Sequence, residues 1–562
     1  MKKTLSIFLF FLAGWNFGQT YTIQRSNWQD AGYKGSKPVF SQTANIMNFG
    51  GNNSGTVSNN AALSVAISSL SGSAGTIYFP AGTFLFTASL NINRDSLVFK
   101  GAGHDSTTIV FNLGGVLNNC ISILGSNVNA DTTIFIQSAL RDSNKVNCFN
   151  PANFQANDWV YLTCNDSLIM NDNWAYGSLG QIIQIQSVNA NTLTFKSPFR
   201  YNYSLSLKPK IKKIIPHHDI GFECLKFKRM DATTGQTSII DFDRAVNCWV
   251  NGIESDSSNF GHIELNRCSN IEITNSFFHH AHAYGGGGKA YGIIFQFSSG
   301  ECKAEGNIFM HLRHGLLFQA GSNGNVCAYN YCFDPYWNEG FFPTNSAGEL
   351  VLHGNFPFAN LFEGNICNNI VIDDSHKNNG PYNTFFRNRA MLYGIYMNNN
   401  PATDSVQFLG NEVTNVASGF YNLAGNGHLQ YGNNIKGTIT PSGTTNLIDS
   451  SLYLTGGTKP LCMNAYSLPA IGMPNVYTIG SNEAFDRYAA GITAQCSCSN
   501  IVTSLNEKTE ENSSVKIYPN PSSGKLFISE EHGRLQEAFI FDLNGKLLKR
   551  IKLSGKNTET DV

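Results

Sequence analysis

Charged residues are scarce in this sequence, and their scarcity argues against several classes of protein. Asp, Glu, Lys and Arg make up 14% of the 562 residues, and the formal net charge is −1. Without a basic excess or an acidic tail, the composition gives no reason to expect a nucleic-acid partner. Beyond the first 18 residues, no stretch reaches the roughly 18 consecutive apolar residues that a membrane-spanning helix requires. We therefore expect no transmembrane segment in the mature chain.

Cysteines are present but form no recognisable framework. Their number, 13, is odd, they are scattered along the chain, and no zinc-type CxxC pair occurs. The only close pair is Cys496 and Cys498, and the sequence leaves their pairing open. Cys332 and Cys367 lie at apolar repeat positions. We expect both to be buried fillers of the interior, with a disulfide between them as the alternative.

Glycine, asparagine and aromatic residues are abundant instead. Gly occurs 53 times and aromatic residues reach 12%, a mixture typical of a β-rich extracellular protein with many tight turns. Residues 1–18 read as a secretory signal peptide, with Lys2 and Lys3 ahead of the apolar run Leu5–Ala13. The protein is therefore expected to be secreted or attached to the outer surface after export.

A repeat becomes visible after residue 219. Segments such as IEITNSFF, CKAEGNIF and FEGNICNN align on shared anchors, which are Gly252, Asn275, Asn307, Asn330, Asn365, Asn388 and Asn411. The steps are 23, 32, 23, 35, 23 and 23 residues, so a period of 23 is interrupted by insertions of 9 and 12 residues. A fixed period with insertions indicates a solenoid, whose coils of about 23 residues hold three short strands each. Asparagines stacked on one another would hydrogen-bond along it.

The N-terminal part carries a resemblance to a known superfamily. Residues 59–111 contain NNAALSVAI, then GTIYFPAGTFLF, then LVFKGAG and TTIVF. This order resembles the start of pectate-lyase-like proteins. The resemblance implies an all-β fold, a right-handed parallel β-helix closed by a short N-terminal capping helix. It implies little about activity, because that fold carries lyases, hydrolases, epimerases and phage adhesins.

The β-helix domain is expected to span residues 19–498. Within it, residues 112–215 are less regular and read either as a small β insertion or as coils with long loops. The repeat fades after residue 415, and residues 416–498 are expected to form a closing segment. The polar residues 499–513 read as a linker.

Residues 514–562 resemble the C-terminal sorting domain of the type IX secretion system of Bacteroidetes. The motifs YPNPSSGKLFI and IFDLNGKLL carry this resemblance. It implies a small β-sandwich-like domain and the secretion machinery as a partner. Family members usually end in a further G-x-Y strand and a basic tail, whereas this chain stops at Asp561 and Val562, so the domain is expected to be truncated.

Titratable residues recur at fixed offsets from the asparagine anchors, beside the two insertions. The residues at four positions past an anchor are His279, His311 and Asp334, and those at seven positions are His282, His314 and Trp337. Coils about 5 Å apart would place each set in a column on one face. Long loops on a rigid scaffold commonly carry function, so we expect the site here. Nearby cations and aromatic residues are Arg313, Lys289, Tyr284 and Tyr336.

This inventory suits the β-elimination of a uronic-acid polysaccharide. The reaction needs a cation for the substrate carboxylate, a base for the C5 proton and an acid for the leaving oxygen. Arg313 or Lys289 would bind the carboxylate, a histidine would be the base, and the aromatic residues would stack on sugar rings. Alternatively His279, His311 and Asp334 would bind a divalent metal such as calcium. A purely structural histidine column is a third interpretation.

A second candidate lies past Asn365, at Asp373, Asp374, His376 and Lys377. Paired carboxylates on a β-helix resemble the polygalacturonase-like hydrolases, although the other motifs of that family are missing here. A solvated acidic turn is the alternative. We therefore expect a monomeric polysaccharide lyase first, a glycoside hydrolase second, and a non-catalytic glycan-binding or adhesion protein third.

Overall fold

The computed structural model describes two compact units, within Met1–Ser497 and Cys498–Val562. The described residues of the first unit are 21–72, 74–339, 346–373, 375–397, 403–455, 459–472 and 480–497. Five strands are described in the second unit. The expected signal peptide and linker lie outside the described residues.

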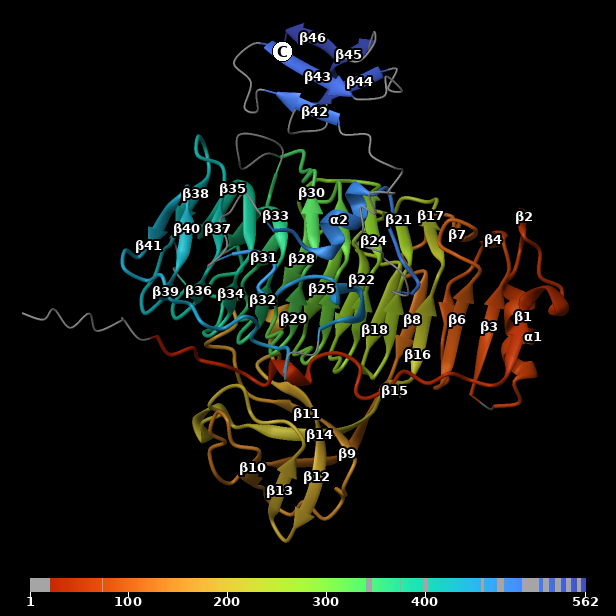
Figure 1. Ribbon diagram of the computed structural model, residues 1–562. Helices are drawn as coiled ribbons and strands as arrows, with labels where there is room; N and C mark the ends of the chain where they lie inside the picture. The colour runs from red at the N-terminus through yellow and green to blue at the C-terminus, as the bar shows by residue number, and fades with distance from the viewer. Residues whose placement is uncertain are drawn as a thin grey trace, which may run out of the picture. The chain divides into compact units, whose positions relative to one another are not determined.

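The first unit is a parallel β-helix, as expected from the repeat, with up to three strands in each coil (Figure 1). The first ladder consists of β1 (Thr43–Asn45), β3 (Gly75–Phe79), β6 (Leu97–Gly101), β16 (Ile220–Glu223), β20 (Trp249–Asn251), β23 (Glu272–Thr274), β26 (Lys303–Glu305), β29 (Val326–Ala328), β32 (Leu361–Glu363), β34 (Thr384–Phe386), β36 (Gln407–Leu409) and β39 (Leu429–Tyr431). Their shortness follows from the period, because a coil of about 23 residues must also make three turns.

Two further parallel ladders complete the coils. The second ladder consists of β2 (Ser54–Ser58), β4 (Gly82–Phe86), β7 (Thr107–Phe111), β17 (Lys226–Arg229), β21 (Glu254–Ser258), β24 (Phe277–Ala281), β27 (Ile308–Met310), β30 (Tyr331–Phe333), β33 (Ile366–Ile372), β35 (Arg389–Met397), β37 (Glu412–Val413) and β40 (Asn433–Ile435). The third ladder consists of β5 (Leu90–Asn91), β8 (Ile121–Leu124), β18 (Ile240–Asp243), β22 (Gly261–Asn266), β25 (Tyr291–Gln296), β28 (His314–Phe318), β31 (Leu350–Leu352), the C-terminal parts of β33 and β35, and β38 (Phe420–Asn422).

Like residues stack on like residues inside the coils. The rings of Phe295 and Phe318 are 4.4 Å apart and nearly parallel, and Phe362 and Phe385 stack at 4.6 Å. Cys332 and Cys367 are both free thiols with no exposed surface in this core, which confirms their expected role as fillers. Of the close pair at the end of the unit, Cys496 instead forms a disulfide with Cys224.

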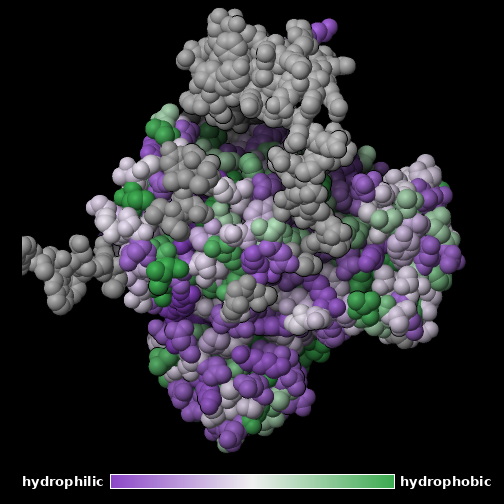
Figure 2. Space-filling view, viewed as in Figure 1, coloured by the Kyte–Doolittle hydropathy of each residue, from purple (hydrophilic) through white to green (hydrophobic). Residues whose placement is uncertain are grey.

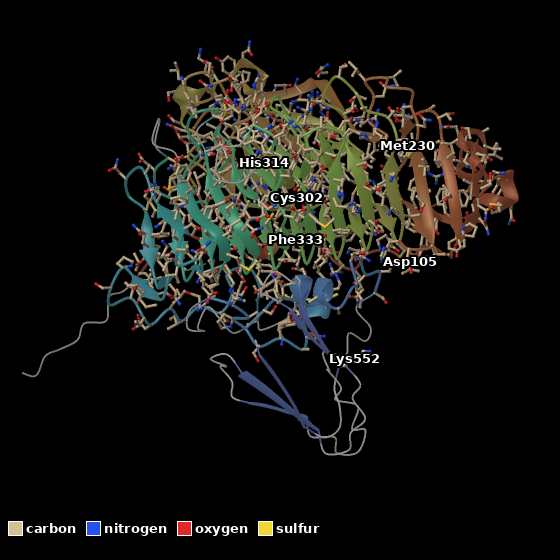
Figure 3. The ribbon with its side chains drawn as sticks, turned by 90° about the horizontal axis from the view of Figure 1, so that it is seen from above. Asp105, Met230, Cys302, His314, Phe333 and Lys552 are labelled. Carbon is tan, nitrogen blue, oxygen red and sulfur yellow. A yellow bond between two sulfur atoms is a disulfide. The ribbon has the colours of Figure 1, made fainter. Side chains whose placement is uncertain are left out.

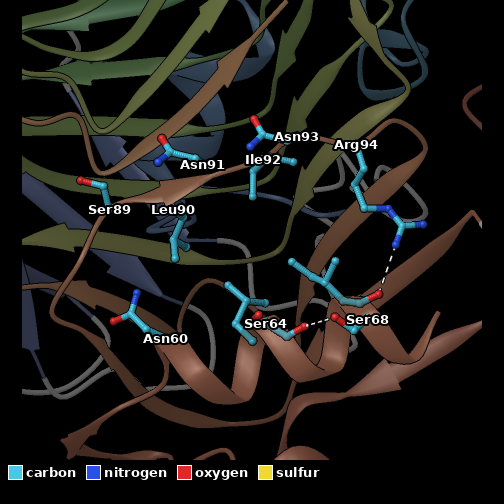
Figure 4. A pocket seen from close by; sticks show the side chains of 11 residues that line it. Asn60, Ser64, Ser68, Ser89, Leu90, Asn91, Ile92, Asn93 and Arg94 are labelled. Carbon is cyan, nitrogen blue, oxygen red and sulfur yellow. Dashed lines mark hydrogen bonds between the residues drawn. The ribbon is translucent and has the colours of Figure 1, made fainter. Parts of the chain in front are cut away.

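Helix α1 (Asn60–Ser69) caps the N-terminal end of the core (Figure 1). It buries Ala62, Leu63 and Ala66 against the first coils. A hollow of about 340 Å³ lies between this helix and residues 89–94. Figure 4 shows its lining side chains, among them Arg94, which donates a hydrogen bond to the carbonyl of Ile67. The described residues that line the hollow are Ser, Asn, Leu and Ile together with Arg94.

A buried asparagine ladder runs along the turn between the first two strands of each coil. Its members are Asn307, Asn330, Asn365, Asn388, Asn411 and Asn433. The Oδ1 of Asn365, for example, accepts from the backbone N of Asn330 at 3.0 Å and from its Nδ2 at 2.9 Å. The Nδ2 of Asn365 in turn donates to the carbonyl of Cys327 at 2.9 Å. The ladder thereby satisfies backbone groups that would otherwise be buried without partners.

The anchor expected at Asn275 is wrong by one residue. Ser276 occupies the ladder position, since its backbone N donates to Oδ1 of Asn307 at 3.1 Å. Phe277 lies opposite Ile308, so the coil step is 31 residues rather than the 32 counted from the anchors. His279 consequently lies opposite Met310, not opposite His311.

Residues 126–215 form a separate antiparallel sheet, which leaves the early coils after β8 and also contacts later coils, for example between Asn171 and Asn355. Its strands are β9 (Ser126–Ile134), β10 (Lys145–Asn147), β11 (Trp159–Thr163), β12 (Gln181–Asn189), β13 (Thr192–Phe195) and β14 (Lys210–Ile215). Leu162, Ile183 and Phe195 belong to an apolar core that also includes Ala320 and Phe358 of the coils. Its face in Figure 2 is mainly hydrophilic. We call residues 126–215 the insertion.

Two peripheral segments cover the coils. Residues 21–42 run along the β-helix, and Trp28 Nε1 in this segment donates to the carbonyl of Ala359 at 2.7 Å (Figure 1). Tyr21 donates to Asp449 at 2.9 Å. Helix α2 (Glu483–Ala489) packs Ala484 on the outer face of the second ladder. Among the described residues, no helix is long and apolar enough to cross a membrane.

The second unit is described by its strands alone. β42 (Val515–Tyr518), β43 (Lys525–Glu530) and β46 (Asn557–Asp561) form one antiparallel sheet, and β44 (Glu537–Phe541) pairs with β45 (Leu547–Lys552) in another. Both YPNPSSGKLFI and IFDLNGKLL contribute strands to it.

Candidate functional site

The structure divides the expected site residues between two places. His279, His311, Asp334, Tyr284 and Tyr336 gather on the outer face of the second ladder. Arg313 and His376 instead line a cavity beside the third ladder. Lys289 and Lys377 are in neither group, since Lys289 does not line the cavity and Lys377 is exposed. Asp374 lies outside the described residues.

His279, His311 and Asp334 of the first group lie beside Asp256 and His280, and we call these five residues the histidine cluster. The Nδ1 atoms of His279 and His280 are 2.8 Å apart, and His311 Nδ1 lies 2.8 Å from Asp334 Oδ2. The rings of His280 and His311 are 5.0 Å apart. Because the coil step is 31 residues, the residue one coil before His311 is His280 rather than His279. The anchor count did not select His280.

Aromatic residues border this cluster. The Tyr336 ring stacks on His311 at 4.6 Å, and Tyr284 meets both of these rings edge-on. His282 lies apart, with Nε2 placed 3.2 Å from the carbonyl of Arg229.

The cavity beside the third ladder has a volume of about 690 Å³. Ladder strands, the loops around residues 287 and 313, and the insertion all contribute to its lining. Trp174 of the insertion meets His376 edge-on at 5.4 Å, and Asp172 Oδ2 lies 2.6 Å from His376 Nδ1. The insertion therefore completes one wall of the cavity.

Two carboxyl groups on neighbouring coils share hydrogen-bond donors in this cavity. Asn266 Nδ2 donates to Asp241 Oδ1 at 2.9 Å and to Glu264 Oε1 at 3.0 Å. Gln296 Nε2 donates to the same Glu264 oxygen at 2.9 Å. Burial, together with the charge of Glu264, raises the pKa of Asp241 well above 3.8, and burial raises the pKa of Glu264 above 4.5. Both shifts favour the protonated form of the pair.

A histidine–aspartate pair lies further along the same ladder. His353 Nδ1 is 2.6 Å from Asp373 Oδ2, and His353 lines the cavity. Burial of Asp373 opposes its ionisation, but the adjacent His353 outweighs it and lowers the pKa of Asp373 to about 2. An ionised Asp373 accepts the Nδ1 proton of His353, which directs the Nε2 lone pair away from the carboxylate.

Arg313 brings a positive charge to the cavity. Its guanidinium lies 5.0 Å from the Trp337 ring and 5.7 Å from the Tyr291 ring, and Nη1 donates to the carbonyl of Gly285 at 3.3 Å. Only 9% of Arg313 is exposed, and among the described residues its Nε has no hydrogen-bond partner. Leaving a buried hydrogen-bond donor without a partner costs free energy. An anionic ligand in the cavity would provide an acceptor for this guanidinium.

His314, adjacent to Arg313, is buried and does not line the cavity. Figure 3 labels it among the side chains of the β-helix. Its Nδ1 is 2.7 Å from the carbonyl of Gly348, and its ring stacks on Tyr291 at 5.0 Å. Burial holds the pKa of His314 well below 6.5, so the ring is neutral. The position of His314 is better explained by a structural role than by the catalytic role expected from the sequence.

Comparison with known proteins identifies two regions. Residues 43–149 match the family described as rhamnogalacturonase A/epimerase, pectate lyase-like, and residues 516–562 match the secretion system C-terminal sorting domain. The N-terminal coils are pectate-lyase-like, and the C-terminal unit is a type IX sorting domain. The protein is therefore secreted to the cell surface or the extracellular space. No curated protein sequence matches the chain.

Solved structures with a similar fold are distant in sequence. The tailspike protein gp49 of Pseudomonas phage LKA1 is 15% identical, with a TM-score of 0.42 over 70% of this chain and 81% of that one. The mannuronan C-5 epimerase AlgE4 A-module of Azotobacter vinelandii is 12% identical (TM-score 0.40, 66% and 77%). The exopolygalacturonase of Thermotoga maritima is 11% identical (TM-score 0.37, 68% and 83%). At these values the comparisons carry no inference about activity.

Sequence reasoning missed Asp241, Glu264 and His353. Asp241 and Glu264 are separated by one coil period of 23 residues, and both alternate with apolar residues in IDFD and HIEL. Aligning the third strand of each coil would have found this pair. His353 and Asp373 are 20 residues apart, and their pairing depends on the shape of the intervening turns.

Proposed function

We propose that the protein is a secreted enzyme that cleaves an acidic polysaccharide in the cavity beside the third ladder, by β-elimination. The observation that carries this proposal is the presence of Arg313 and an aspartate-oriented His353 in one cavity. A volume of about 690 Å³ accommodates a short stretch of sugar rings. Of the cations and bases expected from the sequence, only Arg313 keeps its role here.

Arg313 binds the uronate carboxylate in this mechanism. A guanidinium presents two parallel N–H groups to a carboxylate, and a buried charged pair is stronger than an exposed one. Neutralising the carboxylate acidifies the adjacent C5–H bond. His353 Nε2 then takes the C5 proton, since Asp373 holds the ring and stabilises the resulting imidazolium.

The carboxyl pair supplies the acid. As the C5 proton leaves, its electron pair forms the C4–C5 double bond and the bond from C4 to the leaving oxygen breaks. That oxygen takes a proton from Glu264 or Asp241, whose raised pKa values favour the protonated form that an acid needs. The products are an unsaturated uronate and a new reducing end.

Hydrolysis is the second candidate, and the same carboxyl pair favours it. Two carboxyl groups bridged by Asn266 would serve as acid and base for the attack of water. The expected hydrolase pair at Asp373 and Asp374 is less suitable, because Asp373 is engaged by His353.

A panel of uronic-acid polysaccharides, each with its methyl-esterified form, tests the proposal. The mature protein is incubated with each polymer while ultraviolet absorbance and reducing ends are followed. A lyase produces both signals, whereas a hydrolase produces reducing ends without the absorbance of the unsaturated product. If neither signal appears on any polymer, the enzyme proposal fails and the non-catalytic glycan-binding interpretation gains.

A further inference from the structure

The histidine cluster lies outside the cavity, and its converging side chains call for a separate explanation. One ligand atom each of Asp256, His279 and His280 lies within 4.8 Å of the other two, and none of the three residues lines the cavity. We propose that these side chains bind a divalent transition-metal ion of the zinc class. The inference does not depend on the proposed catalytic activity.

The strand geometry explains how two consecutive histidines reach one ion. Successive side chains of a strand point to opposite faces, and along β24 Phe278 points into the core while His279 points outward. His280 should therefore point inward. It has instead a φ of +59°, a conformation that non-glycine residues rarely adopt, and its side chain is exposed. This backbone turn brings its Nδ1 to 2.8 Å from that of His279.

Asp256 reaches the same point from the preceding coil. It lies directly opposite His279 in the register of β21 and β24, and its Oδ1 is 3.8 Å from His279 Nδ1. The other carboxylate oxygen accepts from Lys228 Nζ at 2.8 Å, and Ser257 donates to Oδ1 at 2.7 Å. A carboxylate oxygen has a second lone pair, so Oδ1 retains capacity for a metal.

The proton arrangement of His279 favours metal ligation. Its Nε2 lies 3.1 Å from Glu254 Oε1, and an ionised carboxylate only accepts hydrogen bonds. The proton is thus held on Nε2, and the Nδ1 lone pair points at His280 and Asp256. Metal-binding histidines commonly donate their other N–H to a carboxylate in this way. Glu254 is itself fixed by Lys226 at 2.5 Å.

The donor set selects the class of metal. Two imidazole nitrogens and one carboxylate oxygen suit zinc and similar ions, whereas calcium takes six to eight oxygen ligands. Three protein ligands leave one tetrahedral position for water or another ligand. His311, whose ring is 5.0 Å from that of His280, borders the site but is engaged by Asp334. The proposed set shares His279 with the divalent-metal set expected from the sequence, and it takes Asp256 and His280 in place of His311 and Asp334.

Titration of the chelator-treated full chain tests the site without any polysaccharide. Isothermal titration with Zn²⁺ and the visible absorption of bound Co²⁺ should each report one high-affinity equivalent. His280→Asn keeps a residue that tolerates the left-handed backbone but removes the imidazole, and it should abolish that equivalent. Glu254→Gln should weaken binding about 10- to 100-fold while leaving the ligands in place.

His218→Ala is the matched control, because His218 is also a surface histidine hydrogen-bonded to a carboxylate, that of Asp219. It should bind Zn²⁺ as the wild type does. Absence of stoichiometric binding by the wild type, or unchanged binding by His280→Asn, would overturn the proposal. Neither result bears on polysaccharide cleavage, which is measured separately.

Discussion

His353 and Asp373 extend from neighbouring coils one residue beyond the paired Leu352 and Ile372, and His353 Nδ1 lies 2.6 Å from Asp373 Oδ2. This contact gives the cavity a base whose orientation is fixed by the coil stacking itself. If His353 removes the C5 proton, His353→Ala should lower kcat by about 10²- to 10⁴-fold. Asp373→Asn should lower kcat while leaving the KM for the polymer nearly unchanged.

His217→Ala provides the control for this prediction, since His217 also contacts an aspartate, Asp95, at 2.8 Å but lies outside the cavity. Its kcat should match the wild type. Full activity of His353→Ala would remove this histidine from the mechanism.

Arg313 should confer selectivity for charged substrate. A hydrogen bond to a charged group contributes about 1.5–3 kcal/mol, so Arg313→Gln should reduce kcat/KM on the acidic polymer by about 10- to 100-fold. Any residual activity on the methyl-esterified polymer should change little. Steady-state kinetics on the two forms measures the difference, and Lys377→Gln, at an exposed cation outside the cavity, serves as the control. An equal loss on both polymers would contradict carboxylate recognition by Arg313.

The asparagine ladder should dominate the stability of the later coils. Asn365→Ala leaves the backbone N of Asn330 and the carbonyl of Cys327 buried without their partners. Each such group costs about 1–3 kcal/mol, so the free energy of unfolding of the coils should fall by about 3 kcal/mol or more. Denaturant unfolding followed by circular dichroism measures this. The exposed Asn48 provides the control variant Asn48→Ala, which should stay near the wild type.

Stability should also decline as pH rises, through Glu363. Burial raises its pKa from 4.5 to about 7, so between these values the folded chain holds a proton that the unfolded chain has released. The unfolded state then binds fewer protons, and the unfolding free energy falls as pH increases from about 4.5 through about 7. Glu363→Gln cannot ionise, so its decline should be shallower. Asp142→Asn, at a carboxyl group that is 70% exposed, should retain the wild-type slope in the same titration.

The fold could be predicted well from the sequence because buried residues of the same type recur at the same position of each coil. Asn330 and Asn365 recur at ladder positions, and Cys332 and Cys367 follow them into the core. The anchor count failed at Gly252 and Asn275, which lie one residue before the ladder positions of Ile253 and Ser276. Asn275 has a left-handed backbone, as Gly252 and Gly306 do, and this shared conformation rather than ladder membership explains its asparagine.

The site was predicted less completely, because it depends on contacts that no period encodes. Arg313 and His376 were selected separately and meet in one cavity. His376 is held there by Asp172 of the insertion, which is 204 residues away in sequence. The insertion forms one wall of the cavity, and its position depends on how it packs on the coils. The strand periodicity of the sequence does not specify that packing.

The segment of residues 21–42 has a consequence for the order of assembly. Its hydrogen bonds link residues separated by 331 positions at Trp28 and Ala359, and by 428 positions at Tyr21 and Asp449. Contacts this distant in sequence form slowly, and these need late coils to be in place first. We therefore expect residues 21–28 to dock after those coils have formed, although they are synthesised first. The time at which this segment becomes resistant to protease during refolding would therefore report when the late coils have formed.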